Sequence, residues 1–295
     1  MNAKLKDRIW TVIIDIAVIF VMLLLIAFVA YVLVEGKGFL DPKFLFGNPK
    51  FGEKGGGIGP QLFNSFYMLV ISLIITVPFG IGAGIYLAEY AKEGPFLNLI
   101  RLCIETMASL PSIVVGLFGL LFFVNKMHMG FTLLAGALAI AILNLPQLTR
   151  VCENAIKASS KLSKEASLGL GATRFQTIKN VVLPSALPQI LTGIILSAGR
   201  IFGEAAALLY TSGMSAPALN FHMSNIFTKN SPFSLVRPAE TLAVYIWQIN
   251  SEGMVPDAKK IANGASAVLI VMVLLFNLFA RIIGKKIYNS YSGKR

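Results

Sequence analysis

Charged residues, cysteines and histidines are all scarce in this sequence of 295 residues. Charged side chains make up 14% of the chain and hydrophobic ones 56%, whereas a soluble domain has about 25% charged residues. So few charges cannot cover a water-exposed surface, which argues against a soluble enzyme and against a disordered chain.

Two cysteines and two histidines limit the chemistry that the chain could perform. Cys103 and Cys152 are too few for a disulfide framework, and they lie in or beside apolar segments, where a reduced thiol is the ordinary state. No metal-ligand spacing surrounds His128 or His222. The glycine-rich stretch at 55–59 is not followed by the Gly-Lys-Ser/Thr of a phosphate-binding loop. We therefore expect no catalytic residues, no metal and no cofactor in this chain.

The charge that is present is unbalanced, with 26 lysines and arginines against 14 acidic residues and a net charge of +12. Nucleic-acid-binding proteins gather basic residues in a stripe or patch on a folded surface. In this sequence, long uncharged runs separate short basic clusters instead. That pattern is typical of a protein that crosses a membrane several times, and we expect lipid rather than nucleic acid around it.

Six apolar runs are long enough to cross the hydrocarbon core, which takes about 20 residues of helix. They lie at residues 9–34, 61–88, 106–125, 130–149, 181–212 and 261–284. The patch at 239–249 is too short to cross, so we expect it at the membrane interface or packed on the bundle. The sequence therefore predicts one all-α integral membrane domain over residues 1–295, with six transmembrane helices.

Prolines and glycines recur within these runs, among them Pro78, Gly82, Gly84 and Pro111. Small residues allow membrane helices to pack closely, and kinks at proline are tolerated there. The same residues would also suit helices that bend while a transporter opens. The sequence leaves both interpretations open.

The distribution of basic residues predicts the orientation of the chain. An even number of spans places both termini on one side, and lysines and arginines are enriched on the cytoplasmic side. Most of the 26 basic residues lie on the side of the termini, with the largest group in the segment 150–182. The first run follows Lys4, Lys6 and Arg8, but it is longer than the apolar part of a signal peptide. We expect both termini in the cytoplasm.

The cytoplasmic segment 150–182 has the pattern of two short amphipathic helices. Apolar residues recur at helical spacing with lysines between them, and Gly169 and Gly171 interrupt the pattern as a turn would. Helices on lipid headgroups would show this pattern, because each basic residue gains about 1 kcal/mol near an anionic surface. A docking element for a cytoplasmic protein would show it too.

Part of this segment resembles the EAA signature of ABC importer permeases. The matching residues are Glu165-Ala166-Ser167, Gly171 six positions after the glutamate, and Val181-Val182-Leu183-Pro184 at the end of the signature. Ser167 stands where the family has a second alanine, and Val181 stands where it usually has isoleucine. The spacing agrees throughout.

This resemblance implies a type I ABC importer permease fold with a cytoplasmic coupling helix. Glu165, Ala166 and Gly171 would form the element that contacts a cytoplasmic ATPase dimer, which would bind the ATP and the Mg. Gly171 would occupy the turn, where a positive φ favours glycine. Leu183 and Pro184 would end the element where the fifth span begins.

Five further strings resemble the phosphate-specific permeases of the PstA type. They are GGGIGPQLFNS, IYLAEYAKEG, LPSIVVGLFGL, LPQLTRVCENAI and LSAGRIFGEAAALL, in matching order and spacing. The resemblance implies ATP-driven import of inorganic phosphate through the cytoplasmic membrane of a bacterium or archaeon. It also implies a second homologous permease and an extracytoplasmic phosphate-binding protein as partners.

Arg200 and Glu204 lie within the fifth predicted span, where a charge costs about 2.5–3.5 kcal/mol. Four residues apart in a helix, they could form a structural ion pair. Alternatively, Arg200 faces the translocation path and binds the anion, since a guanidinium stays charged and engages two oxygens at once. Glu204 would then hold Arg200 in position. Asp15, Glu105 and Glu153 lie near the interface and are expected to be solvated, without a role.

Other functions remain open at this point. An ABC permease for sulfate or molybdate would share these features. A proton-coupled secondary transporter would use Glu204 as its proton site, but it leaves the spacing from Glu165 to Pro184 unexplained. An intramembrane enzyme would need a nucleophile with a base or a pair of metals, which the few histidines and cysteines disfavour.

Overall fold

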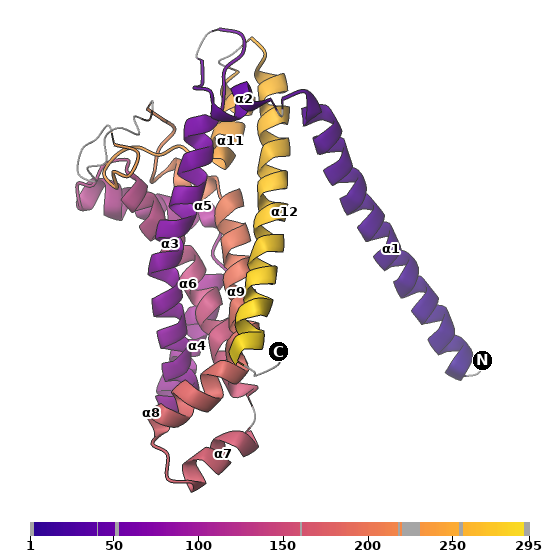
Figure 1. The fold of residues 1–295 in the computed structure, drawn as a ribbon, viewed down its shortest axis with the longest axis vertical. Helices are drawn as coiled ribbons and strands as arrows, with labels where there is room; N and C mark the ends of the chain where they lie inside the picture. The colour runs from indigo at the N-terminus through magenta and orange to yellow at the C-terminus, as the bar shows by residue number, and fades with distance from the viewer. Residues whose placement is uncertain are drawn as a thin grey trace.

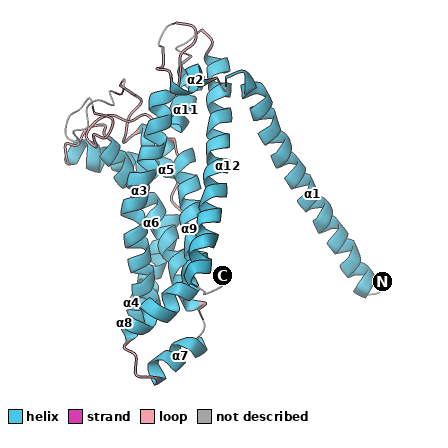
Figure 2. Cartoon of the chain, in the orientation of Figure 1, coloured by secondary structure: helices cyan, strands magenta, loops and turns pink. Residues whose placement is uncertain are grey.

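The computed structural model describes residues 3–39, 41–50, 53–159, 161–217, 219, 231–253 and 256–291. These residues form helices and connecting loops, and no strand occurs among them (Figure 2). The helices are α1 (Ala3–Gly36), η1 (Lys37–Phe39), α2 (Pro42–Phe46), α3 (Gly59–Ile85), η2 (Tyr86–Tyr90), α4 (Pro95–Ala108), α5 (Ser112–Gly119), η3 (Leu120–Lys126), α6 (Leu133–Lys157), α7 (Lys161–Gly169), α8 (Arg174–Thr177), η4 (Ile178–Val182), α9 (Leu183–Gly203), α10 (Ala206–Leu209), α11 (Leu242–Glu252) and α12 (Ala258–Tyr291). The all-α prediction is confirmed. His222 lies outside the described residues.

Five helices of the described chain are long and apolar enough to cross a membrane. They cover Lys6–Gly36, Gly59–Tyr90, Leu133–Lys157, Arg174–Gly203 and Ala258–Lys286. A sixth apolar stretch is a pair of helices, Pro95–Ala108 and Ser112–Lys126, which are bent by 96° relative to each other. The described residues therefore contain five spans, or six if the bent pair counts as one.

The third predicted span, 106–125, is wrong as a single straight helix. α4 ends at Ala108, and Pro111 is extended (φ −59°, ψ 138°) before α5 begins. Proline lacks the amide hydrogen that continues a helix, and it disfavours helical dihedrals in the residue before it. The apolar character of the run continues through this break, so hydropathy did not reveal it.

The centre of the molecule is formed by α3, α6 and α9 (Figure 1). Their buried side chains, among them Met68, Ile140 and Phe202, belong to one core cluster. The close approach of α3 to α6 depends on a small residue, because a Cβ added at Gly84 would lie 2.4 Å from the Cβ of Cys152. At this glycine the close-packing interpretation is confirmed.

α1 leans away from the bundle and meets it at one end (Figure 1). The most apolar stretch of α1 contains no buried residue. At its last residue, a Cβ added to Gly36 would lie 2.4 Å from the Cβ of Ala267 in α12. The apolar side chains along the rest of α1, such as Ile14 and Phe20, are exposed in the isolated chain. Such a surface suits lipid or the helices of another membrane protein.

The two ends of the bundle carry different elements (Figure 1). The beginning of α1 and the end of α12 point toward the end that holds α7 and α8, whereas α2 and α11 lie at the opposite end. We call these the inner end and the outer end, after the orientation that the basic residues predict. Termini at one end agree with an even number of crossings.

The short apolar patch at 239–249 lies largely in α11. Leu242, Tyr245 and Ile249 of this helix are buried in one cluster with Ile261 and Ala265 of α12. Of the two positions expected for the patch, the structure shows the one packed on the bundle.

We expect Gly84→Ala to destabilise the protein and Gly82→Ala to leave its stability unchanged or slightly raised. In a helix interior such as α3, alanine is favoured over glycine by about 0.5–1 kcal/mol. A Cβ at position 84 would overlap Cys152, whereas nothing lies within 4 Å of one at position 82. Overpacking of this kind costs about 1–3 kcal/mol. Thermal unfolding of the detergent-purified protein measures both variants, and equal midpoints would contradict the close packing.

Candidate translocation and coupling sites

Arg200 lies near the end of α9 and contacts α6. Its Nη1 donates a hydrogen bond to Oε1 of Gln147 at 3.0 Å. The arginine is half-buried and the glutamine is exposed in the isolated chain. Among the described residues, no carboxylate forms an ion pair with Arg200. A neutral amide therefore holds this guanidinium.

The expected pairing of Arg200 with Glu204 is wrong. α9 ends at Gly203, and Glu204 is extended (φ −75°, ψ 120°), so the two residues do not share a continuous helix. The buried Glu204 instead accepts a hydrogen bond at Oε1 from the backbone N–H of Ala207, at 3.1 Å. This contact satisfies an otherwise unpaired amide at the start of α10. Glu204 bonds the backbone at the break between α9 and α10, and the described residues show no ion pair between it and Arg200.

The sequence pattern does not single out Gln147, because this residue is uncharged and lies within an apolar run. It belongs to a polar stripe on the exposed face of α6, which continues through Arg150, Asn154 and Lys157 toward the inner end. These positions are three or four residues apart and so share one helix face. The helix is otherwise largely buried. The spacing of these four residues, read on its own, could have revealed the stripe.

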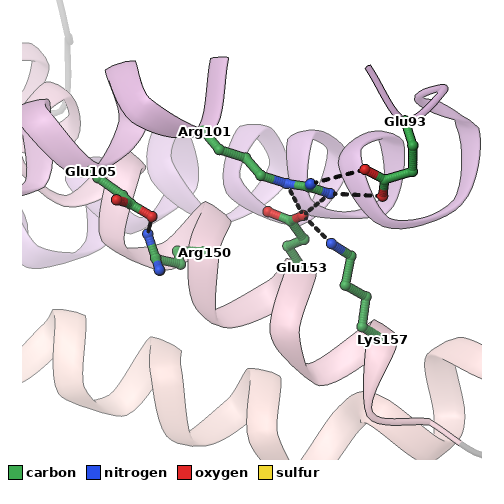
Figure 3. A network of polar contacts seen from close by, with 6 residues as sticks. All are labelled: Glu93, Arg101, Glu105, Arg150, Glu153 and Lys157. Carbon is green, nitrogen blue, oxygen red and sulfur yellow. Dashed lines mark hydrogen bonds and ion pairs between the residues drawn. The ribbon is translucent and has the colours of Figure 1, made fainter. Parts of the chain in front are cut away.

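A network of ion pairs ties α4 to the inner end of α6 (Figure 3). Arg101 donates from Nε to Oε1 of Glu153 at 2.9 Å and also bonds Glu93, while Lys157 donates to the same Glu153 oxygen at 2.7 Å. Arg150 pairs with Glu105 beside this group. The network fixes the helix that precedes the bend at Pro111.

The expectation that Glu153 is solvated is therefore wrong. The side chain of Glu153 is only 7% exposed and lies between two cations. A carboxylate removed from water needs such partners, because its desolvation costs several kcal/mol. Glu105 is about half exposed but is paired with Arg150.

The EAA-like segment forms two helices at the inner end, joined by a turn. α7 ends at Gly169, and Gly171 in the turn has φ +87°. The predicted turn and its left-handed glycine are thus present in the structure. Glu165, Ala166 and Gly171 are all exposed, and Leu170 beside the turn is 90% exposed. The segment presents a free surface away from the bundle.

Leu183 and Pro184 do not end this element, contrary to expectation. α8, the π-helix η4 and α9 follow one another directly and form a single helical stretch from Arg174 to Gly203. Pro184 lies in the first turn of α9, and the N–H of Leu183 bonds to the carbonyl of Ile178, five residues earlier. A π-turn changes the hydrogen-bond register at this point, and the helix continues past the proline.

A buried polar cluster at the outer end joins α3 to the loop before α11. Arg237 is 1% exposed, and its Nη2 donates to Oδ1 of Asn64 at 2.7 Å. Asn64 Nδ2 donates to the carbonyl of Glu240 at 2.9 Å, and Gln61 Nε2 donates to Oε2 of Glu240 at 2.9 Å. The sequence around Arg237 carries no pattern that marks this residue as buried. Its burial depends on contacts with a segment far away in the sequence.

Burial perturbs the two ionisable groups of this cluster in opposite ways. It raises the pKa of Glu240 to about 7; the negative charge of Glu252 adds to this effect, and the hydrogen bond from Gln61 opposes it. It lowers the pKa of Arg237 to about 10. Arg237 also donates to the carbonyls of Pro232 and Pro238, at 2.8 and 3.0 Å.

Comparison with known proteins identifies several relatives. A family model described as "Binding-protein-dependent transport system inner membrane component" matches residues 80–291. The chain is 49% identical over 288 residues to the probable ABC transporter permease protein YqgI of Bacillus subtilis, covering 98% of both proteins. It is 32% identical over 282 residues to the phosphate transport system permease protein PstA of Pasteurella multocida, covering 95% of this chain and 94% of the relative.

Solved structures with a similar fold are more distant in sequence. An ABC transporter that imports the acidic polysaccharide alginate has a TM-score of 0.57 and 17% identity, covering 95% of this chain and 99% of that one. The methionine ABC transporter MetNI has a TM-score of 0.55 and 18% identity, covering 80% and 94%. These likenesses concern the fold alone, which is that of the type I ABC importer permeases.

The raised pKa of Glu240 predicts a loss of stability as pH rises from 4.5, the ordinary value for glutamate, to about 7. Below pH 4.5, the carboxyl group of Glu240 is protonated in both the folded and the unfolded chain. Between these two pH values, Glu240 loses its proton in the unfolded chain but keeps it in the folded protein. Rising pH therefore favours the unfolded chain. Above about 7 the loss is complete.

We therefore expect the unfolding temperature of the detergent-purified protein to fall across this window, by about 2–4 °C for each kcal/mol lost. Glu240→Gln should be more stable than the wild type at pH 8 and should show a flatter pH dependence. Glu53→Gln is the matched control, because the Glu53 side chain is 73% exposed. An unchanged pH profile in Glu240→Gln would contradict this account.

Proposed function

Because the chain belongs to the family of binding-protein-dependent inner membrane transport components, we propose that it is the permease subunit of an ATP-driven importer of inorganic phosphate. Relatives named as phosphate permeases, at 32% and 35% identity, support the choice of cargo. The chain would form the translocation path together with a second, homologous permease. ATP and Mg would be bound by the partner ATPase subunits.

The observation that carries the choice of an anion is the contact between Arg200 and Gln147. A guanidinium paired with a carboxylate is neutralised, whereas one held by an amide keeps its full positive charge. Only one donor of Arg200 is engaged by Gln147, which leaves others for the oxygens of an oxyanion. The polar stripe of α6 would carry the anion from Arg200 toward the inner end.

Coupling to the ATPase would occur at α7 and the turn that follows it. Glu165, Ala166 and Gly171 are exposed there, and Leu170 and Phe175 present apolar surface at 90% and 66% exposure. Exposed apolar side chains on a short helical hairpin suit a cleft on a cytoplasmic protein better than they suit water. The partner would be a dimer of ATPases.

The other partners would contact the outer end and the sides of the bundle. An extracytoplasmic phosphate-binding protein would deliver the anion at the outer end. The exposed apolar faces of α4, α5 and η3, which include Leu99, Leu117 and Leu121, would face the second permease or lipid. The protein would lie in the cytoplasmic membrane of a bacterium or archaeon, with both termini in the cytoplasm.

A permease for another oxyanion, such as sulfate or molybdate, is the second candidate. The guanidinium of Arg200 would bind any of these anions, and the relative at 49% identity is named only as a probable ABC permease. Uptake of radiolabelled orthophosphate, by the chain co-expressed with its partners in proteoliposomes, tests the cargo. Uptake of radiolabelled sulfate or molybdate, without uptake of phosphate, would favour the second candidate. Uptake without ATP would indicate a proton-coupled carrier.

We expect Arg200→Gln to lower phosphate uptake at least about tenfold. The substitution removes a charge-assisted hydrogen bond worth roughly 1.5–3 kcal/mol, while glutamine retains a donor for Gln147. Co-purification of the ATPase should be unchanged, because Arg200 lies far from α7. Arg200→Lys should retain part of the activity, since it keeps the charge without the planar donors. Wild-type uptake by Arg200→Gln would exclude this residue from the path.

We expect Gly171→Ala to weaken coupling and Gly169→Ala to be tolerated. Nothing lies within 4 Å of a Cβ added at either glycine, but only Gly171 has a left-handed φ, at +87°. An L-residue in that conformation costs about 1–2 kcal/mol, so the turn would rearrange. Co-purification of the ATPase and uptake per ATP hydrolysed measure the effect. Equal behaviour of the two variants would argue against the turn as the coupling element.

A further inference from the structure

Two side chains of α7 face the rest of the protein. Lys164 and Ser167 are partly buried, whereas the other described side chains of this helix are exposed. Nζ of Lys164 lies 2.5 Å from Oε2 of Glu89. Oγ of Ser167 lies 3.0 Å from Oγ1 of Thr177 in α8. These contacts fix how α7 sits on the inner end of the bundle.

The ion pair between Lys164 and Glu89 holds α7 against the bundle. The Glu89 side chain is 7% exposed and that of Lys164 is 35% exposed, so the carboxylate is shielded from water while the ammonium is partly exposed. Removing one member of such a pair leaves a buried charge without compensation, which is strongly unfavourable. A pair on the open surface would contribute little. Glu89 therefore ties α7 to the bundle.

Glu89 belongs to η2, which continues α3 as one helical stretch from Gly59 to Tyr90. This stretch has 32 residues and so spans about 48 Å at 1.5 Å per residue. At its opposite end, Gln61 and Asn64 bond the buried Glu240, and the N–H of Leu242 donates to Oγ of Ser65 at 2.9 Å. One continuous helical stretch thus connects α7 at the inner end with the buried cluster at the outer end.

The contact of Ser167 leads to a second helix of the core. Thr177 lies in α8, which continues through η4 into α9, and α9 carries Arg200. Both attachment points of α7 are thus at or beside π-helical turns, η2 and η4. Such turns are local departures from the regular helix and are frequent at functional sites. A displacement of α7 would act on α3 and α9, which both pack on α6.

We propose that the Lys164–Glu89 ion pair is the positioning contact through which a displacement of α7 moves α3, and through α3 the loop from Arg237 to Leu242. The proposal rests on the proposed function, because it takes α7 as the contact with the ATPase. The pair joins no substrate and no nucleotide. Through this pair, a movement of α7 at the inner end would be accompanied by a movement of the loop at the outer end.

The test uses the assembled transporter in proteoliposomes, with the ATPase and the second permease co-purified. ATP hydrolysis is measured with and without a saturating amount of the phosphate-loaded binding protein, and orthophosphate uptake is measured in parallel. Lys164→Gln and Glu89→Gln should each lower the stimulation of hydrolysis and the uptake per ATP at least fivefold. The ATPase should still co-purify. Lys286→Gln, which removes an exposed lysine at the inner end of α12, is the matched control and should behave as the wild type.

The double exchange Glu89→Lys with Lys164→Glu should restore most of the stimulation, because it reverses the pair without removing it. Wild-type stimulation in both single variants would overturn the proposal. Loss of the ATPase from the single variants would show that the pair serves docking, and failure of the double exchange to restore stimulation would show that it serves folding. Either result would overturn the proposal. Absence of any co-purifying ATPase from the wild type would overturn the proposed function itself.

Discussion

A charge or a backbone polar group inside a hydrocarbon layer has no water to bond, so it must find its partner within the protein. The helices of this chain satisfy the backbone in this way, and the buried carboxylates Glu153 and Glu204 follow the same constraint. Glu153 lies between Arg101 and Lys157, and Glu204 accepts the N–H of Ala207 where α9 ends. Each buried acid is thus used to stabilise the junction of two helices.

The same constraint gives Arg200 its distinct position. Its described partner is the neutral side chain of Gln147, so its charge is not cancelled locally. Within the membrane such a charge is costly, and it would be compensated when an anion passes. A guanidinium without a carboxylate partner favours an anionic cargo on chemical grounds.

The packing of the core explains how distant parts of the chain could act together. α3 packs on α6 through Gly84. At the outer end it bonds the loop that contains Glu240, and at the inner end it continues into η2, where Glu89 pairs with Lys164 of α7. Closely packed helices transmit displacements because they have few voids to absorb them. A surface at the inner end and a buried cluster at the outer end are therefore joined by one continuous helical stretch.

The sequence by itself determined the features that depend on composition and local pattern: an all-α membrane protein, the EAA-like segment with its left-handed Gly171, and the family. These follow from apolar runs, glycine punctuation and motif spacing, all of which act between near neighbours. Only the tertiary structure decided the bend at Pro111 and the partners of Arg200, Glu204 and Glu153. The apolar run continues across the bend, so its composition does not mark it. The partners of Arg200 and Glu153 come in part from helices more than 50 residues away, while Glu204 bonds a near neighbour because α9 ends at Gly203. A pattern of single residues cannot show which side chains meet when helices cross.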